Sequence, residues 1–197
     1  MKRKRPGWTP RKRSKWLNNG AGATGEIMFE IIKLLFDICL FKKGPQDLPY
    51  SLWLLRVLAV ADVIVSFLMV SLGTKWLDSL LQALVSVLLI VVFSWVLLYL
   101  ARKRGRFYQT ASALLGADAV ISFFALPAMG SMVIGQGSLL AFIVTMGLMI
   151  WHWAVTGHII RDALGQTLVF SLGLAFLYIF GSYQAMALLF PEVAGVE

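Results

Sequence analysis

Apolar residues are concentrated in five long runs that short polar segments separate. The runs cover residues 52–72, 80–100, 108–129, 138–159 and 167–189. Each is about 20 residues long, the length that an α-helix needs to cross about 30 Å of hydrocarbon. The pattern predicts an all-α polytopic membrane bundle, with about five transmembrane helices in a domain over residues 52–190. Because the separators are short, consecutive helices should run antiparallel.

A shorter amphipathic helix is predicted before the first span, over residues 26–43. Its polar residues recur at spacings of four, three and four and form one narrow stripe: Glu26, Glu30, Lys33 and Asp37. About fifteen residues are too few to span a bilayer, so we expect this helix to lie at the membrane interface. Lys42 and Lys43 at its end should meet lipid phosphates.

Composition agrees with the membrane assignment, because 59% of the 197 residues are hydrophobic and 14% are charged. The formal net charge of +8 is local to a basic tail over residues 1–25, which is predicted to be disordered and cytoplasmic. Its basic side chains are Lys2, Arg3, Lys4, Arg5, Arg11, Lys12, Arg13 and Lys15. We expect them to contact anionic lipid head groups, at about 1 kcal/mol for each residue near the surface. Trp8 and Trp16 leave binding of nucleic acid or a protein as the less favoured alternative.

The remaining basic residues predict the orientation of the chain. Arg102–Arg106 separate the second and third spans, and Arg161 follows the fourth, whereas the first loop carries only Lys75. On an alternating path the tail, Arg102–Arg106 and Arg161 fall on one side, which should be cytoplasmic. The N-terminus is then inside and the C-terminus outside.

Two aspartates are expected at the middle of the membrane, within a motif that occurs twice. Residues 60–68 read VADVIVSFL, and residues 116–124 read GADAVISFF, 56 positions later. Duplication of a helix hairpin and coincidence both remain open. A carboxylate at this depth costs at least about 2.5–3.5 kcal/mol, so Asp62 and Asp118 should face the bundle interior.

Helical spacing supplies possible partners for the two aspartates. Ser66 and Ser122 each follow an aspartate by four residues and should share its face. His152 lies near the centre of the fourth span. Arg56 lies about 9 Å to the cytoplasmic side of Asp62 and either reaches the interface or turns inward. These residues form a predicted intramembrane polar cluster of Asp62, Ser66, Asp118, Ser122, His152 and Arg56.

Two functions are compatible with this cluster. In one, the polar side chains fix the packing of a non-catalytic inner-membrane scaffold or accessory subunit, which is the favoured hypothesis. In the other, Asp62, Asp118 and His152 carry protons or ions through a small coupled transporter or channel. The sequence has no recognised catalytic motif, and His152 and His158 are spaced too far apart to form a helical metal pair. We therefore predict no enzyme, cofactor or metal, and an inert thiol at Cys39.

The layout also resembles that of a known family. Residues 40–51 read LFKKGPQDLPYS, and this stretch is similar to the juxtamembrane segment of small bacterial Yip1-like membrane proteins. The resemblance covers roughly residues 30–190 and leaves the tail outside. It implies a non-enzymatic, multi-pass protein of the bacterial inner membrane that acts through contacts with lipids, with another membrane protein or with copies of itself.

Overall fold

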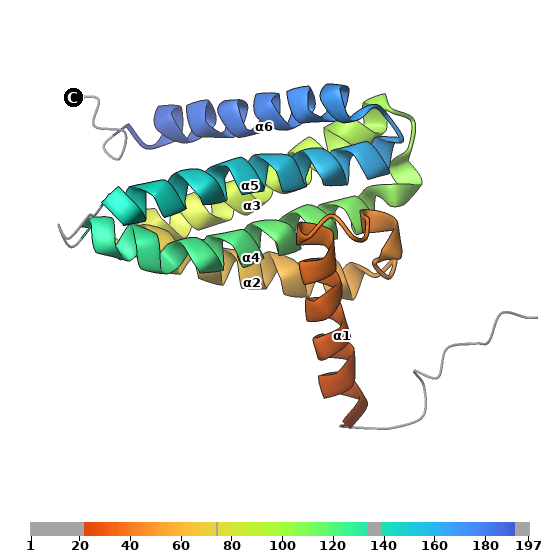
Figure 1. Cartoon of the computed structure of the whole chain (residues 1–197), viewed down its shortest axis with the longest axis horizontal. Coiled ribbons are helices and arrows are strands. Elements are labelled where there is room, and N and C mark those ends of the chain that lie inside the picture. Colours follow the sequence, from red (N-terminus) through yellow and green to blue (C-terminus); the bar gives the residue numbers. More distant parts are fainter. Residues whose placement is uncertain (1–21, 74, 134–138, 192–197) are drawn as a thin grey trace, which may run out of the picture. The chain divides into compact units, whose positions relative to one another are not determined.

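The computed structural model describes residues 22–73, 75–133 and 139–191 (Figure 1). All regular structure in these ranges is helical, which confirms the predicted all-α class. The elements are α1 (Gly22–Cys39), η2 (Pro45–Asp47), α2 (Leu52–Ser71), α3 (Trp76–Leu100), η3 (Arg104–Arg106), α4 (Phe107–Val133), α5 (Leu139–Leu164) and α6 (Leu168–Leu189). The eight basic residues of the tail lie outside the described residues.

Five of the described helices, α2 to α6, are long and apolar enough to cross a membrane, so this is a multi-pass membrane protein. Three helices, α3, α4 and α5, are longer than the predicted runs. α3 begins at Trp76, and Asp78 in its first turn favours the positive end of the helix dipole. α5 continues to Leu164, and Arg161 in its last turn favours the negative end. A prediction from hydrophobicity alone therefore underestimates the length of a helix that charged residues extend beyond the hydrocarbon.

The chain divides into two compact units, Met1–Lys33 and Leu34–Glu197. The described part of the first unit is the beginning of α1. The second unit contains the last turns of α1 and the five long helices. Consecutive long helices run antiparallel, as the short connections predicted (Figure 1).

Helix α4 is the most enclosed of the five long helices. Half of its most apolar window is buried, against 6–28% for the other four. It packs against α2, α3 and α5, whereas α6 packs mainly against α5. Small buried side chains allow these close approaches, and on α4 they are Ala111, Ala113, Gly116, Ala117, Ala119 and Ala125.

The last turns of α1 pack against the middle of this bundle. Leu35 is buried and lies against Gly116 of α4, where an added Cβ would come within 2.4 Å of a Leu35 methyl carbon. The indole Nε1 of Trp151 donates a hydrogen bond of 3.0 Å to the carbonyl oxygen of Cys39. Gly116 lies about 13 Å from the start of α4, and Trp151 about 20 Å from the end of α5. These contacts are therefore well inside the bundle and not at its rim.

The basic connections meet at one end of the bundle and close the ends of its helices. Arg102 after α3 and Gly165 after α5 both have positive φ, at 56° and 63°, which ends each helix in a left-handed turn. The ammonium group of Lys103 donates a hydrogen bond to the Leu164 carbonyl oxygen, and Arg106 reaches the Ala163 carbonyl at 3.4 Å. Basic side chains of one connection thus cap the carbonyl end of α5.

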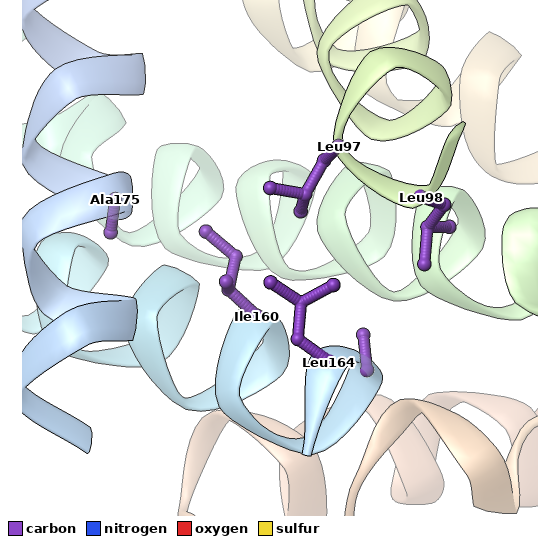
Figure 2. Packing of buried hydrophobic residues seen from close by; sticks show 6 residues of the cluster. Leu97, Leu98, Ile160, Leu164 and Ala175 are labelled. Carbon is purple, nitrogen blue, oxygen red and sulfur yellow. The ribbon is translucent and has the colours of Figure 1, made fainter. Parts of the chain in front are cut away.

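An apolar cluster lies beneath this basic end and joins three helices (Figure 2). Leu97 and Leu98 come from α3, Ile160 and Leu164 from α5, and Ala175 from α6. Ile160 and Ala175 are fully enclosed. Helix α6 packs mainly against α5, and in this cluster it also packs against α3.

Candidate functional site

Asp62 lies on the packing face of α2. The buried residues of α2 are Leu54, Leu58 and Asp62, spaced four apart, so the aspartate continues an apolar stripe that faces the bundle interior. Its side chain is 0% exposed, and neither carboxyl oxygen has a hydrogen-bond donor among the described residues. Gln82, Thr110 and Ser112 also have a buried polar atom without a hydrogen-bond partner among the described residues, but Asp62 is the ionisable residue of these four.

Asp118 of α4 is an ionisable neighbour of Asp62, and the side chains of the two residues interact. Two ionised carboxylates offer only acceptors. A hydrogen bond between these groups therefore requires that one of them carries a proton. The motif that occurs twice thus places its two aspartates on neighbouring helices that run in the same direction (Figure 1).

His152 of α5 is the third member of the cluster. Its Nε2 atom lies 3.1 Å from Oδ1 of Asp118. The exposed fraction of the side chain falls along the series, from 29% at His152 to 15% at Asp118, and Asp62 is fully enclosed. The three groups therefore form a line from a partly accessible imidazole to an inaccessible carboxyl.

Tyr178 of α6 is a fourth ionisable neighbour, which the sequence analysis did not identify. It lies within electrostatic range of both aspartates, and its side chain is hydrogen-bonded with that of Ser182. The Tyr178 ring also packs on Phe93 of α3, with centroids 4.4 Å apart. Tyr178 and Ser182 are four residues apart near the centre of the last span, and this polar pair was the available signal.

The serines that follow the aspartates do not play their expected role. Asp62 receives no hydrogen bond from Ser66, and the described residues show none between Ser122 and Asp118. Serine in a helix commonly bonds to the carbonyl of its own preceding turn, as Ser94 does here with the Ile90 carbonyl at 2.7 Å. Shared helical face was therefore a poor guide to hydrogen bonding.

Arg56 lies on the exposed side of α2, away from the acidic pair. Six residues of helix separate it from Asp62, a rotation of about 240° at 3.6 residues per turn. Of the two positions considered for Arg56, the structure therefore supports the one at the surface. The cluster is thus reduced to Asp62, Asp118 and His152, with Tyr178 beside it.

A second polar group joins α5 to the segment before α2. His158 is 5% exposed, and its Nε2 atom makes a hydrogen bond of 3.0 Å with the Lys43 carbonyl oxygen. Asp162 lies 3.7 Å from the same ring and pairs with Arg161 at 2.9 Å. Lys43 in turn pairs with Asp37 at 3.6 Å. This network connects backbone and side chains at the basic end, which is a structural role.

Neither polar group forms a metal site within the described part of the chain, where no set of three His, Cys, Asp or Glu side chains could hold an ion. No protein-family model, curated protein or solved structure matches the chain. Its class therefore follows from the fold, which is that of a multi-pass helical membrane protein. Its function has to be argued from the buried acidic pair and from the surfaces of the helices.

Proposed function

We propose that this chain is a non-catalytic, multi-pass protein of the bacterial inner membrane that acts through contacts with lipids or with other membrane proteins. The observation that carries the proposal is how the long helices distribute their apolar and acidic side chains between the outer surface and the interior. The long helices expose large apolar side chains, whereas the aspartates near the centres of α2 and α4, Asp62 and Asp118, face inward. Helix α6 is the clearest case, with exposed Val169, Phe176, Leu177, Phe180 and Leu188. The resemblance to Yip1-like proteins is in keeping with such a role.

The orientation is part of this proposal. Arg102, Lys103, Arg106 and Arg161 gather at one end of the bundle, and Lys75 is the basic residue that the described connections place at the other. The positive-inside rule then places the basic end in the cytoplasm. The tail would extend along the anionic inner leaflet and bind its head groups.

Reporter fusions test this orientation. A fusion after Gly105 should report the cytoplasm, and a fusion after Glu197 should report the outside. A fusion after Gly73, in the connection between α2 and α3, serves as the matched control and should also report the outside. If Gly105 and Glu197 lie on the same side, the orientation and the five-span topology are both wrong.

Helix α6 is the surface that we expect to bind a partner protein or a second copy of the chain. Only 6% of its most apolar window is buried, the lowest value of the five. A photo-crosslinking residue in place of Phe180, which is 53% exposed, should form protein adducts in cells. The control is the same residue in place of Leu88 of α3, which is 58% exposed. Lipid adducts alone at both positions, together with a monomer in mild detergent, would refute the scaffold proposal.

Proton-coupled transport is the second candidate, and the contact between Asp118 and His152 favours it. Membrane-embedded chains of carboxyl and imidazole groups are typical of proton relays. Purified protein in liposomes with an internal pH-sensitive dye would test it. Transport predicts a proton flux that Asp62→Asn abolishes and Asp78→Asn, at the end of α3, preserves. Equal flux in empty liposomes and in those with the wild type would eliminate this candidate.

A further inference from the structure

We infer that Asp62 and Asp118 form a proton-binding site in the centre of the bundle, and that His152 is the group through which this site exchanges its proton. The ligand is the hydrogen ion itself. The inference does not depend on whether the protein is a scaffold or a transporter, because it concerns what the core must bind in order to pack.

Asp62 is buried without a hydrogen-bond donor among the described residues, and this is the first reason for the inference. An ionised carboxylate that is fully enclosed and has no donor is left without any compensation for its lost hydration. A proton held between the two carboxyl groups removes this conflict, since one group then donates to the other. Aspartic proteases use the same chemistry, in which two adjacent carboxyl groups share one proton.

The second argument is the charge of the whole cluster. The cluster consists of Asp62 on α2, Asp118 on α4 and His152 on α5. With two carboxylates and a neutral imidazole its charge is −2, so it has to bind two protons to become neutral. Tyr178 on α6 is neutral as a phenol and adds no charge. On α3 the ionisable residues are Asp78 and Tyr99, both within three residues of an end of the helix. A neutral cluster is the state that the membrane interior favours.

Asp37 is the ionisable residue of α1 that belongs to the second unit, and it is paired away from this site. The end of α1 contacts α4 at Gly116, and helical geometry places Asp118 about 200° around the helix from that residue. Asp37 is paired with Lys43 near the basic end. Among the described residues, the ion pairs join the cluster to no basic side chain other than His152, so a proton has to supply the missing positive charge.

Exchange proceeds through His152. The O–H bond of the Asp118 carboxyl breaks as an N–H bond forms at Nε2, across the 3.1 Å contact. The products are an Asp118 carboxylate and a His152 imidazolium, paired with each other. The proton on Asp62 then bridges to the carboxylate of Asp118. His152 has the largest exposed fraction of the three, so we assign to it the exchange of the proton with the surroundings.

Infrared spectroscopy of the full chain in lipid vesicles tests the inference, because a protonated carboxyl has its own C=O band. The wild type should show this band at neutral pH, and the double variant Asp62→Asn with Asp118→Asn should lose it. The matched control Asp78→Asn should keep it. If an Asn variant does not fold, Asp62→Glu or Asp118→Glu replaces it and should shift the band without removing it.

Exchange of the band in heavy water tests the role of His152. His152→Gln should retain the band but slow its shift on transfer to deuterated buffer, whereas His158→Gln should leave the exchange rate unchanged. A wild type without the band at neutral pH, or a band that survives in the double Asn variant, would overturn the proton site. Loss of the band when sodium replaces choline in the buffer would also overturn it, because a metal cation would then occupy the pair.

Discussion

Gly157 is a position where a single methyl group should disturb the packing of two long helices. Helix α5 meets α6 there, and a Cβ added at Gly157 would lie 2.6 Å from Cδ2 of Leu172 and 3.4 Å from its backbone Cα. The distance to Cα is an ordinary contact, so it is the Leu172 side chain, whose Cγ would lie at 3.2 Å, that has to move from its place between the helices. Small residues at such crossings allow helices in membranes to pack closely.

The magnitude follows from two opposing effects. Alanine is favoured over glycine in a helix by up to about 1 kcal/mol. Overpacking of a tight contact typically costs about 1–3 kcal/mol. At Gly147 in the same helix an added Cβ meets nothing within 4 Å, so Gly147→Ala should gain the first term without the second. We therefore expect Gly157→Ala to be less stable than Gly147→Ala by about 1–3 kcal/mol.

Thermal unfolding of the two variants in the same detergent measures this difference. At about 2–4 °C per kcal/mol for a chain of this size, the midpoint of Gly157→Ala should lie about 2–12 °C below that of Gly147→Ala. Equal midpoints, or a higher midpoint for Gly157→Ala, would show that α5 and α6 do not approach as closely as the structure has them.

Two predictions concern the end of α1. Spin labels at Phe36 and Leu40, which are exposed at the end of α1, should lie deep in lipid vesicles, because the neighbouring Leu35 packs on Gly116 and the Cys39 carbonyl accepts from Trp151. A label at Tyr50 is the shallow control, and equal shallow depth at all three positions would support a helix confined to the interface. The Cys39 thiol is fully enclosed, and burial raises its pKa to about 12, so at neutral pH it should react with maleimide only after denaturation, and rapid labelling of the folded chain would contradict its burial.

The overall class of this protein could be predicted from hydrophobic runs alone, since a bilayer requires helices of a minimum length. The ends of α3 and α5 were less predictable, because Asp78 and Arg161 extend helices beyond the apolar run. The short connections also predicted antiparallel neighbours. They did not predict that Lys103 and Arg106 cap the end of α5, since this depends on how two connections meet.

The candidate site was predicted in part. Burial cost indicated that Asp62 and Asp118 face inward, because a lone charge in lipid is expensive. Sequence spacing could not show that His152, on another helix, contacts Asp118, or that Tyr178 lies beside the pair. It also favoured Ser66 as a partner of Asp62, whereas the structure leaves that carboxyl to Asp118. Contacts within one helix follow from periodicity, but contacts between helices depend on packing.

The central claim is that Asp62 and Asp118 meet inside the bundle, and thiol crosslinking in native membranes tests it most directly. In a Cys39→Ser background, Asp62→Cys combined with Asp118→Cys should be joined within one chain by a short bifunctional thiol reagent. Ile64→Cys combined with Asp118→Cys is the control, because Ile64 is 53% exposed on another face of α2. Crosslinking of the first pair but not the second would support the account. Crosslinking of the Ile64 pair alone, or of neither pair in a folded chain, would contradict it.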